Sequence, residues 1–164
     1  MSQSFHAIKG LTIWRGAKIA TMDSSLTQDY GLLEGYDLLV KDQKIVALVE
    51  AGSYETPVDA LIHQVDDLLI TPGFIDCHTH IVFGGNRAKE WELRLNGVPY
   101  AEISAKGGGI NSTVKNTREA SFNELYDRAY PRMAALAEDG VTTLESKTGY
   151  GLNLEDERKQ LAVS

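Results

Sequence analysis

The sequence Thr-Pro-Gly-Phe-Ile-Asp-Cys-His-Thr-His, residues 71–80, constrains the chain more than any other stretch. A Pro-Gly pair opens it, a short apolar run follows, and two histidines end it. Side chains alternate between the two faces of a strand, so Asp76, His78 and His80 would share one face. Two imidazoles projecting together from a strand end are suited to a divalent metal, which zinc sites hold at about 2.0–2.1 Å.

The composition limits the class of protein. The chain has 164 residues, of which 43% are apolar and 24% charged, enough for one domain or two small ones. The net charge of −7 argues against a nucleic-acid-binding surface. Cys77 is the single cysteine, which excludes an internal disulfide and is typical of a reducing compartment. No secretory signal or membrane-spanning run is evident, so we expect a soluble cytoplasmic protein without nucleic-acid or membrane partners.

Residues 1–70 have the pattern of a β-rich domain. Short runs of aliphatic and β-branched residues are separated by turn residues. The expected strands are 11–14, 18–22, 36–40, 44–49 and 67–70. Lys-Asp-Gln at 41–43 is expected to form a hairpin turn. His6 and His63 are isolated, so this region is expected to be structural.

Residues 71–164 have a different pattern, in which strands alternate with helices. After the first strand, helices are expected near 89–95 and 99–106, with weaker helical character at 111–120. A capping box from Ser121 to Glu124 starts a long helix, in which Pro131 should either kink the helix or remove one backbone hydrogen bond. A β-branched strand at 141–146 and a helix capped by Asn153 complete the order. This βαβα order predicts an α/β fold with parallel strands, whose C-terminal ends line a site.

Arg87 and Tyr150 are the candidate substrate-binding residues. Arg87 follows a flexible Gly-Gly-Asn loop, where its planar guanidinium could pair with a carboxylate; the alternative is an ordinary surface arginine. Tyr150 stands between two glycines, which leaves its backbone free to direct the phenol into a pocket. Lys147 is open to several roles, including an ion pair with Glu145, and Tyr100 is a weaker pocket candidate.

The histidines have two neighbours whose roles are open or structural. Asp76 could orient His78, or it could be a buried polar residue bonded to the backbone. Cys77 points to the opposite face and is expected to be a buried packing residue.

The metal shell is incomplete within this sequence. A catalytic zinc needs three protein ligands and a water, and His78 and His80 supply only two. We therefore expect the remaining ligands and the catalytic residues beyond Ser164. The last helix begins at Asn153 without a C-cap signal, so either it frays at a natural end or the chain is a piece of something longer.

The motif P-G-F-I-D-C-H-T-H, followed by F-G-G-N-R, resembles the metal-dependent amidohydrolase superfamily. Two later motifs, G-G-G-I-N-S-T-V-K-N-T-R and G-V-T-T-L-E-S-K-T-G-Y-G-L, narrow the resemblance to hydrolases of a cyclic amide in histidine degradation. The resemblance implies the start of a (β/α)8 barrel at 71–164, apparently incomplete. Residues 1–70 would be the N-terminal part of a small composite β-sandwich domain.

The resemblance also implies a site. It implies one divalent metal ion, zinc or iron, with His78 and His80 as its first two ligands. Arg87 and Tyr150 match residues that contact a small-molecule substrate carrying a carboxylate. Two alternatives stay open, namely a mononuclear deaminase of another nitrogen heterocycle and an inactive fragment lacking the remaining ligands. A homodimer is also left open.

Overall fold

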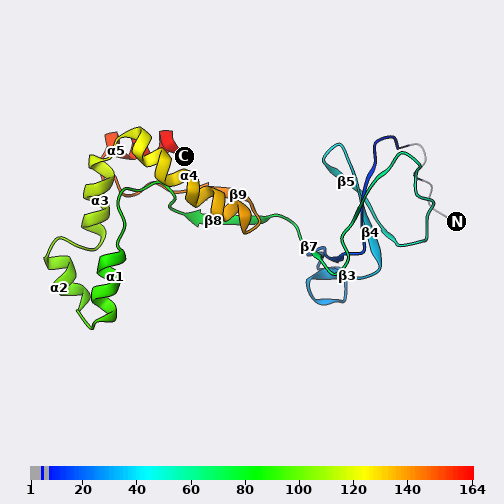
Figure 1. The fold of residues 1–164 in the computed structure, drawn as a ribbon, viewed down its shortest axis with the longest axis horizontal. Coiled ribbons are helices and arrows are strands. Elements are labelled where there is room, and N and C mark those ends of the chain that lie inside the picture. The colour runs from blue at the N-terminus through cyan, green and yellow to red at the C-terminus, as the bar shows by residue number, and fades with distance from the viewer. Residues whose placement is uncertain (1–4, 6–7) are drawn as a thin grey trace. The chain divides into compact units, whose positions relative to one another are not determined.

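The computed structural model describes residue 5 and residues 8–164, so His6 lies outside the described residues. The chain divides into two compact units, Met1–Pro72 and Gly73–Ser164, which we call the N-terminal and C-terminal units (Figure 1). The N-terminal unit is rich in strands, whereas the C-terminal unit mixes strands and helices. The expected α/β class is therefore confirmed at the level of a mixed α and β protein.

The N-terminal unit contains two small sheets. One has the strand order β5-β4-β1-β6 and the other β3-β2-β7. The elements are β1 (Thr12–Arg15), β2 (Lys18–Ala20), the 3-10 helix η1 (Asp29–Gly31), β3 (Leu32–Leu33), β4 (Tyr36–Lys41), β5 (Lys44–Glu50), β6 (Leu61–Gln64) and β7 (Leu69–Ile70). The sequence pattern does not predict β3 or β6, whose pairing with β2 and β1 depends on tertiary contacts.

The hairpin between β4 and β5 forms as the sequence predicts. Lys41 pairs with Lys44, and the two residues between them, Asp42 and Gln43, both have positive φ angles of 49° and 63°. That conformation at both central residues matches the right-handed twist of the flanking strands. The apolar core of this unit gathers around fully buried Leu11, Ile13 and Leu39.

A polar network is also buried in the N-terminal unit. The Asp37 side chain is fully buried, and its Oδ2 accepts hydrogen bonds from Arg15 Nε at 2.9 Å and from the Tyr54 hydroxyl at 2.7 Å. Arg15 also donates to Thr56 Oγ1 at 3.1 Å. Burial and the hydrogen bond to Asp37 raise the pKa of Tyr54. The network joins β1, β4 and the segment before β6.

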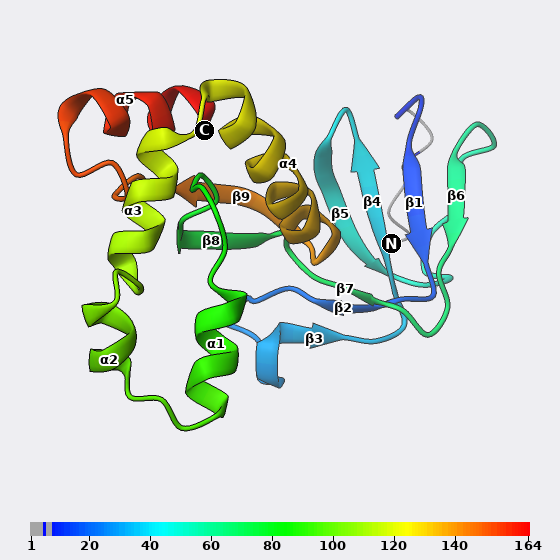
Figure 2. The same cartoon turned by 60° about the vertical axis from the view of Figure 1, so that its left-hand side comes forward.

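The C-terminal unit follows the order predicted from the sequence. Its elements are β8 (Phe74–Thr79), α1 (Ala88–Leu95), α2 (Tyr100–Ala105), α3 (Ile110–Glu119), α4 (Phe122–Glu138), β9 (Val141–Ser146) and α5 (Leu154–Val163). The strands β8 and β9 pair in parallel. Figure 2 shows α4 running along one face of this pair, with α1, α2 and α3 in the connection that leaves β8. Among the described helices, none is both long enough and apolar enough to cross a membrane.

The long helix α4 forms for the reasons its sequence gives. The Ser121 hydroxyl accepts from the Glu124 backbone N–H at 3.3 Å, and Glu124 Oε2 accepts from the Ser121 N–H at 2.8 Å, so the capping box is complete. The helix continues through Pro131. Leu125 and Ala129 on its buried face pack with residues after β8 to form the core, which consists of Ile81, Val82, Leu125 and Ala129 with Leu136, Leu144 and Val163 against them.

Candidate active site

The C-terminal ends of β8 and β9 lie side by side. Thr79 is in register with Ser146, and the Lys147 N–H donates to the Thr79 carbonyl at 2.8 Å. The chain leaving β8 carries His80, and the loop leaving β9 carries Tyr150. The parallel pairing therefore brings together two loops that four helices separate in sequence.

His78 and His80 are neighbours at the end of β8. Their rings lie 5.4 Å apart between centroids, at an interplanar angle of 69°. The His80 Nδ1 is buried and has no hydrogen-bond partner among the described residues. A neutral imidazole nitrogen without a partner can bind a metal or accept a proton.

Asp76 supports the backbone of this strand rather than an imidazole ring. Its Oδ1 accepts from the backbone N–H of His78 at 3.1 Å. Of the two roles considered for Asp76, the structure therefore favours the backbone-bonded one. Cys77 is exposed on the described chain, so the expectation that it is a buried packing residue is wrong here. The physical reason is that β8 pairs with a single described strand, β9, and α4 packs beside β9.

Tyr150 faces the histidines from the loop after β9. Its ring lies 5.2 Å from the His80 ring and 5.9 Å from the Phe83 ring, measured between centroids. Gly149 has a φ of 137°, and a Cβ there would lie 3.4 Å from His80 Cε1. The backbone angle therefore favours glycine before Tyr150, whereas a Cβ there would make only an ordinary contact with His80.

Arg132 on α4 is a residue of this region that the sequence pattern does not single out. Its guanidinium lies 3.5 Å from the centre of the Phe83 ring. Its Nη1 donates to the carbonyls of Ile81 at 2.7 Å and Phe83 at 3.1 Å. Burial, assisted by the nearby charge of Arg128, lowers the pKa of Arg132. Arg132 therefore fixes the segment that follows His80 and supports the ring that touches Tyr150.

Arg87 lies at the start of α1 and is oriented by Glu90. Its Nε donates to Glu90 Oε2 at 2.8 Å, and the same carboxylate oxygen accepts from the Gly109 N–H at 3.0 Å. The hydrogen bond that Arg87 donates to Glu90, together with the negative charge of that carboxylate, raises the pKa of Arg87. An exposed groove beside it is lined by Arg87, Ala88, Glu90, Trp91 and Arg94.

The loop that leads to Arg87 is packed tightly on α3. The Gly84 N–H donates to Thr117 Oγ1 at 3.0 Å, and Thr117 in turn donates to the Thr113 carbonyl at 2.7 Å. A Cβ on Gly84 would lie 2.4 Å from the Asn116 carbonyl oxygen, so a side chain cannot be placed there without a shift of backbone. The Gly-Gly pair is therefore a packing requirement of this loop.

The remaining candidates contact one another or lie nearby. Lys147 forms an ion pair with Glu145, which agrees with one of the roles considered for it. That pair lowers the pKa of Glu145. A Cβ added to Gly109 would lie 2.6 Å from the Tyr100 hydroxyl oxygen. Tyr100 therefore packs over the glycine turn that precedes α3.

Metal ligands within the described part of the chain do not form a complete set. Among residue 5 and residues 8–164, no group of three or more His, Cys, Asp or Glu side chains could hold a metal ion. The fit to a metal consequently rests on His78, His80 and the partnerless Nδ1 of His80.

Comparison with known sequences identifies close relatives. The chain is 56% identical to an imidazolonepropionase of Photorhabdus laumondii subsp. laumondii over 151 residues, which cover 92% of this chain and 36% of the relative. An imidazolonepropionase of Klebsiella pneumoniae (strain 342) is 54% identical over 152 residues, which cover 93% of this chain and 37% of the relative. An imidazolonepropionase of Chromobacterium violaceum is 49% identical over 154 residues, which cover 93% of this chain and 37% of the relative. No family model matches the chain.

Solved structures show likeness in fold. A prolidase in complex with N-methylphosphonate-L-proline has a TM-score of 0.55 at 18% identity, covering 82% of this chain and 25% of the prolidase chain. A second structure, of an uncharacterized protein, has a TM-score of 0.53 at the same identity and coverage. The chain spans little more than a third of the length of the curated relatives. By sequence, it corresponds to the N-terminal part of the imidazolonepropionases.

Proposed function

We propose that this chain supplies the first part of the active site of an imidazolonepropionase. The complete protein would hydrolyse the cyclic amide of 4-imidazolone-5-propanoate to N-formimino-L-glutamate in histidine degradation. The observation that carries the proposal is the group formed by His78, His80 and Tyr150 at adjacent strand ends, in a chain about half identical to these enzymes.

His78 and His80 are the proposed metal ligands. Both leave the end of one strand, and His80 keeps a buried nitrogen without a partner among the described residues, so the donors fit a divalent metal, zinc or iron. When bound, such a metal polarises a carbonyl and makes a water more acidic. The remaining ligands and the acid–base group would come from the rest of the barrel.

Arg87 and Tyr150 are the proposed substrate contacts. The guanidinium of Arg87 is charged at any physiological pH and can pair with the propionate carboxylate through two hydrogen bonds. Glu90 fixes the orientation of that guanidinium through Nε. Tyr150, beside His80, would present its hydroxyl to the polar edge of the ring. Holding the substrate at both ends would orient the amide carbon toward the reacting water.

The reaction requires the addition of one water. The water oxygen adds to the ring carbonyl carbon, the amide C–N bond breaks, and the released nitrogen takes up a proton. The residues of this chain bind and orient the substrate, while the proton transfer is assigned to residues outside it.

A (β/α)8 barrel is the proposed architecture of the complete catalytic domain. The parallel pairing of β8 and β9, joined through α1 to α4, supports this proposal, because such a barrel is built from parallel strands connected by helices. Ile75 on β8 is 72% exposed, as expected for a strand whose other neighbours complete a closed sheet. The N-terminal unit would be part of the accompanying β-sandwich domain.

The test is turnover by a complete protein. We would join this chain to the remainder of the Photorhabdus relative, which gives what we call the extended protein. Hydrolysis of 4-imidazolone-5-propanoate, with no deamination of purine or pyrimidine bases, is the expected result. Turnover of a nucleobase in place of the imidazolone would reject the proposal in favour of a deaminase. Full activity from the 164-residue chain alone would contradict the placement of the missing ligands outside it.

A further inference from the structure

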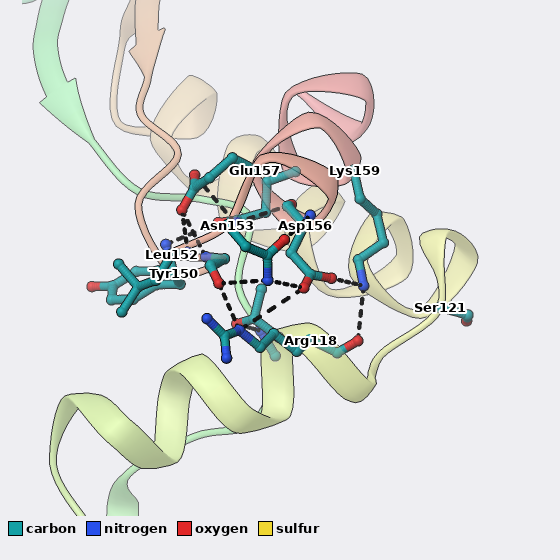
Figure 3. Close-up of polar contacts among 12 residues, drawn as sticks. Arg118, Ser121, Tyr150, Leu152, Asn153, Asp156, Glu157 and Lys159 are labelled. Carbon is teal, nitrogen blue, oxygen red and sulfur yellow. Dashed lines mark hydrogen bonds and ion pairs between the residues drawn. The ribbon is translucent and has the colours of Figure 1, made fainter.

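The loop that carries Tyr150 is held by side chains of α5 rather than by its own turn geometry. Glu157 Oε1 accepts hydrogen bonds from the backbone N–H groups of Gly151 at 2.8 Å and Leu152 at 2.7 Å (Figure 3). The Thr148 side chain and the Gly149 N–H also hydrogen-bond to this carboxylate. One carboxylate thus binds the loop on both sides of Tyr150.

Two further side chains complete this arrangement, which with Glu157 we call the loop clasp. Gln160 is fully buried, and its Oε1 accepts from the Tyr150 N–H at 3.4 Å. Arg118 on α3 donates through Nε to the Gly151 carbonyl at 2.6 Å. Around Tyr150, therefore, successive backbone groups are bound by side chains that approach from two helices.

The loop backbone at Gly151 also packs tightly against α5. A Cβ on Gly151 would lie 2.6 Å from the backbone nitrogen of Glu157, so the loop backbone lies directly against the first turn of α5. Leu152 has a positive φ of 53°, which is unfavourable for leucine and is maintained by the surrounding contacts. A loop in this conformation needs its hydrogen bonds to stay in one position.

Helix α3, which carries Arg118, also holds the loop that leads to Arg87. On α3, Thr117 binds the Gly84 N–H and its neighbour Arg118 binds the Gly151 carbonyl. Lys159 on α5 ties the two helices together by donating to the Arg118 carbonyl at 2.9 Å, and it pairs with Asp156 at 2.8 Å (Figure 3). Consecutive residues of one helix therefore set the separation of the two loops.

We infer that Glu157 is a positioning residue that fixes Tyr150 against His80 and so sets the affinity for substrate. The inference rests on the proposed function for its substrate, but the placement of Tyr150 can be measured without turnover. Glu157 does not touch the rings of the site; it acts through the backbone of the loop. Its loss frees a loop that must then be ordered each time substrate binds.

The first experiment uses the 164-residue chain. Glu157→Gln and Glu157→Ala are compared with Glu155→Gln, which removes the same charge from an exposed position in the same helix turn. We expect amide hydrogen exchange at Gly151 and Leu152 to rise about tenfold or more in Glu157→Ala, since each amide loses its acceptor. The rise should be smaller in Glu157→Gln, whose amide oxygen can still accept but carries no charge. Nuclear Overhauser contacts between the Tyr150 and His80 rings should weaken. Unchanged exchange and ring contacts would overturn the inference, as would equal changes in Glu155→Gln.

The second experiment uses the extended protein with 4-imidazolone-5-propanoate. Glu157→Ala should raise KM about tenfold with little change in kcat. In a Tyr150→Phe background, the same substitution should raise KM by a smaller factor than it does in the unsubstituted extended protein. Additive effects would mean that Glu157 does not act through Tyr150. No turnover by the unsubstituted extended protein would reject the proposed function, while the exchange and ring-contact measurements would still decide the role of Glu157.

Discussion

The ring of Tyr150 lies 5.2 Å from the ring of His80, although α1, α2, α3 and α4 separate them in the chain. Parallel pairing of β8 with β9 creates this contact, because it places the two strand ends level with each other. In the proposed function, this contact would bring the Tyr150 hydroxyl close to the two proposed metal ligands.

In the extended protein, Arg87→Ala should raise KM for 4-imidazolone-5-propanoate roughly 10- to 100-fold, as expected for the loss of charged hydrogen bonds. Metal content should not change. His78→Ala should reduce metal content. Steady-state kinetics and elemental analysis check both, with Arg158→Ala as a control on the exposed face of α5. Loss of metal in the Arg87 variant would contradict the division of roles.

Protonation of Glu157 should release the Tyr150 loop. Burial alone would raise the pKa of this carboxyl, but hydrogen bonds from Thr148, Leu152, Gly151 and Gly149 outweigh it and lower the pKa below the ordinary value of 4.5. A group with a lowered folded pKa stabilises above its unfolded pKa and loses that contribution as the pH falls through the folded value. The Gly151 and Leu152 amide shifts should therefore move only below pH 4.5.

The control for this titration is Glu157→Gln, which should abolish the shift at the two amides. Asp156 lies in the same turn and also has a lowered pKa, because of hydrogen bonds with Lys159 and Asn153. A transition that persists in Glu157→Gln would therefore assign the effect to Asp156.

Arg15→Met should destabilise the N-terminal unit by about 3 kcal/mol, because it leaves the buried carboxylate of Asp37 without its cation. Lys18→Met removes an exposed pair with Glu34 and should leave the free energy of unfolding nearly unchanged. Urea unfolding followed by Trp14 fluorescence, in a Trp91→Phe background, measures both. Equal effects of the two substitutions would refute the distinction.

Gly84→Ala should destabilise the C-terminal unit by about 1–3 kcal/mol, because the new Cβ would meet the Asn116 carbonyl. Gly97→Ala has open space around it and a positive φ, so it should cost only about 1 kcal/mol. Trp91 fluorescence in a Trp14→Phe background reports the unfolding of this unit. A Gly84 variant as stable as the parent would show that the loop can move away from α3.

Ser121→Ala should destabilise α4 by about 1 kcal/mol through loss of the N-cap. Ser121→Asp should recover most of that loss, since aspartate caps as well as serine. Thermal unfolding of the three proteins by circular dichroism provides the comparison. If the aspartate variant were no more stable than the alanine variant, capping would not be the reason for the effect.

Local sequence signals predicted much of the fold. Ser121 and Glu124 fixed the start of α4, and Lys41-Asp42-Gln43 fixed the hairpin turn, because each acts within a few residues. The strand β6 escaped prediction because its partner, β1, lies far away in the chain. Arg132 and Glu157 escaped for the same reason: each looks like an ordinary charged helix residue until the loop that it binds is known.

The sequence by itself determined the two histidines, their shared strand face and the close relation to the imidazolonepropionases, because these follow from residue order and strand periodicity. Only the tertiary structure decided that Tyr150 meets His80, that Asp76 bonds to backbone and that α3 and α5 hold the loops. Those contacts join residues distant in sequence, and they exist because parallel strand pairing and helix packing bring the strand ends and helix surfaces within hydrogen-bond distance.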